Sequence, residues 1–192
     1  MLIGIAGKAG SGKTAAANYL CEKYNFEKKA FADPLKDILS ILTNTPREDF
    51  EKDKESVLDF WGITKRQLMQ KFGTEVMRNE YPKHIPLPCI GFETNSIWVL
   101  NFIDWYTRIH IRPGGRIISP IVVHDVRFQD EIDAIRYLGG VVIYIDRIEL
   151  HLENFGQSMH SSETLSKDKV DKIIKNNGTL AELYQKIDQI FG

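Results

Sequence analysis

The chain has 192 residues, of which 43% are hydrophobic and 27% are charged, and these values are typical of a single globular domain that buries a core. Its 25 lysines and arginines nearly balance its 26 aspartates and glutamates, which disfavours a general nucleic-acid-binding protein but leaves room for a local basic pocket that binds a small anion. Cys21 and Cys89 cannot supply a four-thiolate zinc site, and no apolar run approaches the ~18 residues of a membrane span, so we expect a cytoplasmic protein with reduced thiols.

The first part of the chain alternates between apolar runs and helical patterns. Residues 2–6, LIGIA, form a short apolar run ended by glycine, which predicts a buried parallel strand. Residues 12–24 have helical spacing, and residues 26–31 predict a second strand. The pair Asp33-Pro34 predicts the start of the next helix, with the aspartate as its cap and the proline in its first turn.

The stretch from residue 45 to residue 115 lacks a clear strand, and we interpret it as a helical insertion between the second and third strands. Residues 64–78 predict a strong helix, and residues 81–89 hold three prolines, which predicts a loop. Residues 97–109 predict an amphipathic helix.

The remainder of the chain returns to strand–helix alternation. Residues 120–126 and 141–146 predict buried strands with a helix at 130–138 between them, and a last short strand within 169–178 precedes a helix at 179–191. Apolar strands that alternate with helices indicate an α/β sandwich of three layers, in which a five-stranded parallel sheet has helices on both faces.

The stretch GKAGSGKT, residues 7–14, matches the phosphate-binding pattern G-x-x-x-x-G-K-[ST] between a predicted strand and a predicted helix. Glycines allow backbone N–H groups to turn inward around phosphate oxygens, and the helix N-terminus adds the positive end of its dipole. Lys13 places a cation on the outer phosphates, and Thr14 offers a hydroxyl to Mg²⁺. The residues expected to bind a nucleoside triphosphate are Gly7, Ala9, Gly10, Ser11, Gly12, Lys13 and Thr14.

Two other interpretations of this stretch are disfavoured. A flexible turn that matches the pattern by chance would not be expected to lie between a predicted strand and a predicted helix. A dinucleotide-binding loop has the spacing G-x-G-x-x-G, whereas the glycines here run G-x-x-G-x-G and a lysine follows.

Polar residues also follow other predicted strands, at the sheet edge where open α/β folds bind ligands. Asp125 comes at the end of the third predicted strand and is a candidate Mg²⁺ ligand. Arg127 leaves the same strand end, where its planar guanidinium can hold two phosphate oxygens. Asp33 and Lys36 follow the second strand; a helix cap explains Asp33 equally well, and a solvated surface lysine explains Lys36 slightly better.

The predicted helix at 64–78 has two distinct faces. At 100° per residue, Leu68, Phe72 and Val76 share an apolar stripe. Gly73 costs ~1 kcal/mol relative to alanine within a helix, which favours close approach of a ligand or another backbone, with an ordinary packing contact as the alternative. Amides read base edges and an arginine holds phosphate, so the opposite, polar face is a candidate acceptor site. That face consists of Gln67, Gln70, Thr74 and Arg78.

Two features after the fourth predicted strand carry weaker signals. Arg147 is placed like the arginine of a closing lid, which predicts a lid-like region at residues 147–168. His160 lies in a polar loop, and a lone histidine is more often structural than catalytic.

An ordered set of motifs resembles the phage-type deoxynucleoside monophosphate kinases, which belong to the nucleoside monophosphate kinase group of P-loop proteins. The resemblance covers about residues 3–183 and is weakest at 45–63 and 82–115, and the combination of GTE-x-x-R with DVRF is more specific than the P-loop alone. The motifs are FADPLK at 31–36, QKFGTEVMR at 70–78, VVHDVRFQDE at 122–131, HSSE at 160–163 and IIKNNGTL at 173–180.

The resemblance implies one kinase domain over residues 1–192, with the insertion at 45–115 as its acceptor-binding part. It implies transfer of the γ-phosphoryl group of ATP, with Mg²⁺, to a deoxynucleoside 5′-monophosphate. Asp33 would lie between metal and acceptor, and Asp125 and Arg127 would hold metal-bound water and phosphate. The acceptor site would consist of Gln70, Thr74, Glu75 and Arg78, and the adenine-side loop of Asn177, Gly178 and Thr179.

The full prediction has two overlapping sets of residues, and His160 and Glu163 match a family motif without an assigned role. The predicted catalytic residues are Lys13, Asp33, Arg78 and Arg127. The predicted substrate-binding residues are Asp33, Lys36, Gln67, Gln70, Thr74, Glu75, Arg78, Arg127 and Arg147.

Other acceptors and other classes of protein remain alternatives. Adenylate and thymidylate kinases usually have a phosphate-binding arginine where this sequence has Lys36. The acceptor could therefore be that of a dephospho-coenzyme A kinase or a phosphomevalonate kinase, and both of these families remain alternatives. A GTP-binding switch has an N-K-x-D motif, which this sequence lacks, and an ATP-driven motor has a glutamate where Val126 follows Asp125. A nucleotide-binding module without catalysis also stays open, although the presence of Lys13, Thr14 and Asp125 together disfavours it.

The predicted helix at 97–109 carries aromatic residues at near-helical spacing. Trp98, Phe102 and Trp105 favour core packing over a platform for stacking bases. Related kinases are often dimers, so the same helix is a candidate homodimer interface.

Overall fold

The computed structural model describes residues 1–112, 116–117, 119–147, 165 and 167–191. The chain divides into two compact units. We call Met1–Ala30 with Ile103–Gly192 the sheet unit, and Phe31–Phe102 the helical unit.

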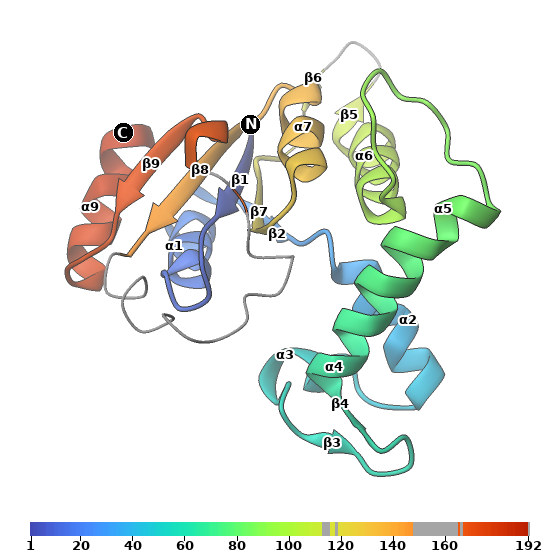
Figure 1. Ribbon diagram of the computed structural model, residues 1–192. Coiled ribbons are helices and arrows are strands. Elements are labelled where there is room, and N and C mark those ends of the chain that lie inside the picture. Colours follow the sequence, from blue (N-terminus) through green and yellow to red (C-terminus); the bar gives the residue numbers. More distant parts are fainter. Residues whose placement is uncertain (113–115, 118, 148–164, 166, 192) are drawn as a thin grey trace. The chain divides into compact units, whose positions relative to one another are not determined.

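The sheet unit is built on a five-stranded sheet with the order β2-β7-β1-β8-β9, and every neighbouring pair is parallel. The first strand along the chain, β1, therefore lies at the centre of the sheet (Figure 1). This arrangement confirms the predicted five-stranded parallel sheet. The strands are β1 (Leu2–Ala6), β2 (Glu27–Lys29), β7 (Ile121–Val126), β8 (Val141–Asp146) and β9 (Lys172–Lys175).

Helices cover both faces of this sheet, as predicted. The helices α1 (Lys13–Tyr24) and α9 (Leu180–Phe191) share one core with alternate residues of the strands, among them Ile5 and Ile143. On the other face, α7 (Gln129–Tyr137) lies so close that a Cβ at Gly4 would overlap the side chain of Ile135. The alternation of strand side chains between two apolar faces explains why these strands read as continuous apolar runs.

The helical unit holds its own small core, in which Leu35, Leu39, Phe50 and Trp98 are buried. Two short strands pair antiparallel within it, in an interval that we expected to lack strands. Two-residue strands are too short to leave a readable alternation of apolar and polar positions. The elements are α2 (Asp33–Thr43), α3 (Asp49–Lys52), β3 (Val57–Leu58), β4 (Ile63–Thr64), α4 (Lys65–Gln70), η1 (Lys71–Glu80), α5 (Tyr81–His84) and the start of α6 (Ile97–His110).

The predicted helix at 64–78 changes type along its length. It begins as an α-helix and continues from Lys71 as a π-helix, in which hydrogen bonds run from residue i to i+5. The wider turn moves the buried position after Phe72 from i+4 to i+5, so Met77 packs on the core while Val76 is 46% exposed. The predicted stripe was therefore wrong at Val76, because it assumed an α-helical period throughout.

Two local predictions also need correction. Residues 81–84 form a helical turn with Pro82 in its first turn, so the proline-rich loop begins only at Ile85. Asp33 is not a helix cap, because the cap position of α2 belongs to Ala32 and no side chain caps it. The Asp33 carboxylate instead contacts Arg47.

The aromatic helix α6 contributes to the interior. Trp98 and Phe102 are at most 7% exposed, and Phe102 contacts Phe31. This confirms core packing for these two side chains. Trp105 is half-buried, and this helix stays a candidate homodimer interface.

Candidate functional site: a phosphate-binding loop and a charged helix end

The glycine-rich loop leaves β1 and enters α1, as predicted. Gly7, Gly10 and Gly12 have φ angles of 144°, 76° and 103°, a region that side chains other than glycine's rarely adopt. A Cβ at Gly7 would lie 2.5 Å from the carbonyl oxygen of Ile145. The loop is therefore a tight backbone turn whose shape depends on glycine, and such a turn fits a chain of phosphates.

Lys13 folds back over the loop that precedes it. Its Nζ donates hydrogen bonds of 2.7 Å to the carbonyl oxygens of Gly7 and Lys8. A cation is thus held at the rim of the backbone turn, where it can exchange these carbonyl oxygens for phosphate oxygens. Ser11, within the same loop, is buried, and its Oγ has no hydrogen-bond partner among the described residues.

The end of β7 lies next to the start of the loop. Val126 pairs with Ala6, the residue before Gly7, so the half-buried Asp125 sits at the same edge of the sheet. Thr14 is exposed on the first turn of α1. A hydroxyl and a carboxylate are oxygen donors of the kind that Mg²⁺ prefers, so these residues fit the predicted metal.

A carboxylate that sequence reasoning missed fixes the turn after β7. Glu131 is only 4% exposed and accepts hydrogen bonds from the backbone N–H groups of Arg127 at 2.6 Å and Phe128 at 3.0 Å. Arg127 itself is exposed. The spacing of a glutamate at the third position of α7 was a readable capping signal, although the residue before that helix is a phenylalanine.

The ends of β8 and β9 complete this edge. Asp146 is buried and accepts a 2.7 Å hydrogen bond from Lys167 Nζ, while its carbonyl oxygen accepts the N–H of Asn176 at 2.7 Å. Arg147 follows β8 and is half-buried. Sequence reasoning did not single out Asn176 or Lys167.

The predicted adenine-side loop is exposed and borders a cavity of about 450 Å³. Within it, Thr179 Oγ1 accepts the N–H of Glu182 at 3.3 Å, and Glu182 accepts the N–H of Thr179 at 3.0 Å. Thr179 therefore caps α9, and Asn177 and Gly178 remain as cavity-lining residues. The cavity is lined by Lys175, Asn177, Gly178, Glu182, Gln185, Lys186 and Gln189.

In the helical unit, a network of five charged side chains joins the start of α2 to Arg47 and to α3. Arg47 donates to Asp33 at 2.7 Å, to Asp37 at 2.6 Å and to Glu51 at 3.0 Å. Lys36 lies 2.9 Å from Glu51 and 3.6 Å from Asp33, and it is buried, which contradicts its interpretation as a solvated lysine. The hydrogen bond from Lys36 lowers the pKa of Glu51, and the nearby Arg47 adds to that shift.

The predicted acceptor face on α4 and η1 is only partly available. Gln67 forms a capping box with Thr64, which favours a structural role for its carboxamide oxygen. Gln70, Thr74 and Arg78 are half-buried, and Glu75 is exposed. Those four residues stay candidates for contact with the acceptor.

Gly73 is explained by packing. A Cβ at this position would lie 2.6 Å from Leu35 Cδ2, and the Gly73 carbonyl oxygen accepts a 2.9 Å hydrogen bond from Trp98 Nε1. The close approach that the sequence predicted is thus to a neighbouring side chain.

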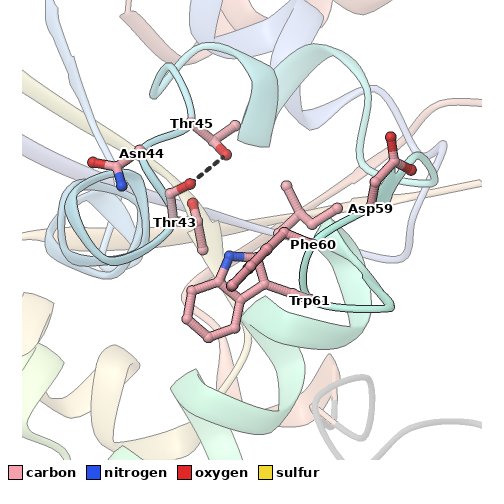
Figure 2. Close-up of a pocket in the computed structure, with 7 residues that line it drawn as sticks. Thr43, Asn44, Thr45, Asp59, Phe60 and Trp61 are labelled. Atoms are coloured by element: carbon pink, nitrogen blue, oxygen red, sulfur yellow. Dashed lines mark hydrogen bonds between the residues drawn. The ribbon is translucent and has the colours of Figure 1, made fainter.

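A second cavity, of about 350 Å³, opens in the helical unit away from every residue predicted from sequence (Figure 2). Phe60 and Trp61 form one wall, and Phe60 is 93% exposed. Asn44 and Thr45 lie across from them.

Topology and loop together define the class of protein: an α/β protein of the P-loop NTPase type, whose glycine-rich loop fits phosphate groups. Residues 48–187 match the deoxynucleotide monophosphate kinase family. The chain is 35% identical over 191 residues to a putative deoxynucleotide monophosphate kinase of Acanthamoeba polyphaga mimivirus, with 97% of this chain and 94% of the relative aligned. It is 28% identical over 152 residues to the deoxynucleotide monophosphate kinase of Escherichia phage RB69, with 79% of this chain and 53% of that enzyme aligned.

The chain therefore belongs to the deoxynucleotide monophosphate kinase family, which confirms the family and the kinase class that the motifs predicted. Among solved structures, shikimate kinase from Aquifex aeolicus aligns with 100% of this chain and 96% of its own, at a TM-score of 0.46 and 13% identity. Within the described residues, no helix has the length and apolarity of a membrane span.

The structure sorts the predicted residues into the two units. His160, Glu163 and most of the predicted lid at 147–168 lie outside the described residues. The sheet unit carries Gly7, Ala9, Gly10, Ser11, Gly12, Lys13, Thr14, Asp125, Arg127, Arg147, Asn177, Gly178 and Thr179. The helical unit carries Asp33, Lys36, Gln67, Gln70, Thr74, Glu75 and Arg78.

Proposed function

We propose that the protein transfers the γ-phosphoryl group of ATP to the 5′-phosphate of a deoxynucleoside monophosphate, which yields a deoxynucleoside diphosphate and ADP. The observation that carries this proposal is the glycine-shaped loop with Lys13 at its rim, in a chain of this family. The loop supports the donor, and the names of the mimivirus and phage relatives support the acceptor.

Residues of the sheet unit bind the donor. Backbone N–H groups of the loop surround the phosphates, and Lys13 Nζ leaves the carbonyl oxygens of Gly7 and Lys8 for the outer phosphates. Thr14 and Asp125 would hold Mg²⁺, which would offset negative charge on the phosphate oxygens. Arg127 and Arg147 add cations at the same edge of the sheet, and Asn177 and Gly178 border the adenine.

Residues of the helical unit bind the acceptor. Gln70, Thr74 and Glu75 recognise the nucleoside, and the Arg78 guanidinium holds its 5′-phosphate through paired hydrogen bonds. Asp33 orients the acceptor, on the side that would face Mg²⁺. A phosphate acceptor is already an anion near neutral pH, so no strong general base is required of Asp33.

The reaction joins two anions, and charge neutralisation is its main requirement. An oxygen of the acceptor phosphate attacks the γ-phosphorus while the bond from that phosphorus to the β–γ bridging oxygen breaks, and ADP leaves. Lys13 and Arg127 neutralise charge on the donor, and Arg78 neutralises charge on the acceptor.

Product analysis tests the proposal. The protein is incubated with Mg²⁺, ATP and each of the four common deoxynucleoside monophosphates, their ribose counterparts, dephospho-coenzyme A or phosphomevalonate, and the products are separated by anion exchange. We expect a deoxynucleoside diphosphate and an equal amount of ADP from at least one deoxynucleotide. Turnover only with a non-nucleotide acceptor would overturn the assigned acceptor and leave the ATP site standing.

A further inference from the structure

A buried amide links the end of β9 to the phosphate-binding loop. Asn176 is 6% exposed, and its Nδ2 donates a 2.8 Å hydrogen bond to the carbonyl oxygen of Ser11, 165 residues earlier in the chain. Its own backbone N–H is bound at 2.7 Å by the carbonyl oxygen of Asp146, at the end of β8. The side chain is therefore anchored on the sheet and reaches across to the loop.

The position of this hydrogen bond matters because the loop is rich in glycine. Gly10 and Gly12 flank Ser11 and give the backbone unusual freedom, so the loop's shape needs support from outside. A Cβ at Gly12 would lie 2.7 Å from Asn176 Nδ2, which shows that the amide fills the space beside the backbone. The Ser11 carbonyl oxygen is fixed by Asn176, and the Ser11 N–H donates a 3.2 Å hydrogen bond to the Lys8 carbonyl oxygen, so the backbone of the loop is held on both sides of this residue.

We infer that Asn176 is a positioning residue, which holds the phosphate-binding loop in the shape that receives the phosphates of ATP. The inference rests on the proposed role of ATP as donor. Asn176 directly precedes Asn177 and Gly178, which border the cavity proposed for the adenine. One short segment thus positions the phosphate-binding loop through the amide of Asn176 and lines the proposed adenine site with the next two residues.

Two substitutions and a matched control test the inference. Asn176→Asp keeps the size of the side chain and replaces the donating nitrogen with an oxygen, and Asn176→Ala removes the group. The control is Asp171→Ala, which removes a side chain that accepts the N–H of Val142 at 2.8 Å near the opposite end of the same pair of strands. Binding of MgADP and of inorganic tripolyphosphate is measured by calorimetry, and melting temperatures are recorded for all proteins.

We expect Asn176→Ala to bind MgADP and tripolyphosphate roughly tenfold more weakly, the effect of losing one hydrogen bond and leaving a buried carbonyl oxygen without its donor. Asn176→Asp should bind both at least as weakly, because its carboxylate also repels the Ser11 carbonyl oxygen and the phosphates. KM for ATP should rise while KM for the acceptor stays unchanged. Asp171→Ala should lower the melting temperature and leave both affinities as in the wild type.

The outcomes separate the inference from the proposed function. Wild-type affinities in Asn176 variants that melt lower would make Asn176 purely structural and overturn the inference. Weaker MgADP binding with unchanged tripolyphosphate binding would move its role to the base site and also overturn it. A wild-type protein that binds no MgADP would instead contradict the ATP site itself.

Discussion

The two units of the chain prepare their binding surfaces in opposite ways. In the sheet unit, the surface is made of backbone: three glycines with positive φ form the loop, and the buried Asn176 side chain supports it. The buried Glu131 fixes the neighbouring turn after β7. In the helical unit, the surface is side chain: five charged groups pair with one another around the start of α2.

The difference follows from the ligands proposed for each unit. A triphosphate offers many oxygens and little else, and converging N–H groups can bind it whatever the nucleoside. An acceptor must be distinguished from other nucleotides, and side chains on a helix supply that selectivity. Changes to the two surfaces should therefore affect donor and acceptor kinetics separately.

The largest effect is expected from Lys13→Ala, on the donor side. Loss of a cation that contacts the transferring phosphate should lower kcat by ~10³-fold, by analogy with other groups that stabilise transition-state charge. Circular dichroism should show an intact fold. Lys28→Ala is the control, because Lys28 is an exposed cation of the same unit that donates a 2.9 Å hydrogen bond to the side chain of Asn18, and this variant should keep full activity.

On the acceptor side, Arg78→Ala should lower kcat/KM for the deoxynucleotide by roughly 100-fold, the value of a pair of charged hydrogen bonds to phosphate, while KM for ATP is kept. Lys83→Ala removes another cation of the helical unit, paired at 2.7 Å with Glu80, and is the matched control. Unchanged acceptor kinetics in Arg78→Ala would remove this arginine from the site.

A smaller effect on the same side is expected from Arg47→Ala. Without this guanidinium, Asp33, Asp37 and Glu51 lose a shared cation, and the orientation of Asp33 relaxes. We expect kcat/KM for the acceptor to fall by about tenfold, as for one lost charged hydrogen bond. Arg66→Ala breaks only an exposed pair with Glu55 and should be silent. A shift in KM for ATP alone would contradict the division between units.

Gly73→Ala tests packing in the helical unit through stability. The added Cβ would crowd Leu35, which costs about 1–3 kcal/mol, while the gain in helix propensity returns about 1 kcal/mol. We therefore expect a net loss of about 1 kcal/mol in urea unfolding, and partial recovery in the double variant with Leu35→Val. A Gly73→Ala protein as stable as the wild type would show that the close packing of Leu35 does not require a glycine at this position.

The smallest effect concerns the packing of α1 on α9 in the sheet unit. Asp188 accepts hydrogen bonds from Lys23 at 2.8 Å, Tyr24 at 2.8 Å and Tyr19 at 2.9 Å, and the Lys23 hydrogen bond, with those of both tyrosines, lowers its pKa below the ordinary 3.8. Because the folded pKa is the lower one, this stabilisation is present above pH 3.8 and is lost as the pH falls through the folded value.

Asp188→Asn should therefore lose melting temperature at pH 7 but show a shallower decline than the wild type below about pH 4. Thermal unfolding between pH 7 and pH 3 measures both slopes. Parallel slopes for the two proteins would show that Asp188 titrates alike in the folded and unfolded chains.

The contrast between backbone and side chain also explains which features could be predicted from sequence. The loop and the five strands were readable, because glycine spacing and apolar runs are local patterns. The network around Arg47 was not, since its partners lie up to 14 residues away and meet only in the folded unit. Asn176 was missed for the same reason, because its hydrogen bond to Ser11 joins distant parts of the chain.

The error in the predicted apolar stripe of the 64–78 helix has a different physical origin. The stripe through Leu68 and Phe72 was correct where the helix has the α period and failed at Val76, where the π-helix begins to shift the buried face. Periodicity identifies a helix but does not say which hydrogen-bond step it will use. Gln67 and Thr179 were predicted as binding residues, the first from the polar face of its helix and the second from its motif. In the structure, their side-chain oxygens accept backbone N–H groups at the ends of helices.

The most direct test of the division of roles is amide hydrogen exchange with each ligand alone. We expect MgADP to slow exchange at residues 7–14 in the sheet unit. One of the four common deoxynucleoside monophosphates should slow exchange at residues 33–51 and 65–80 in the helical unit. Protection of the helical unit by none of the four, or protection of the phosphate-binding loop by the monophosphate alone, would contradict the assignment of donor and acceptor to separate units.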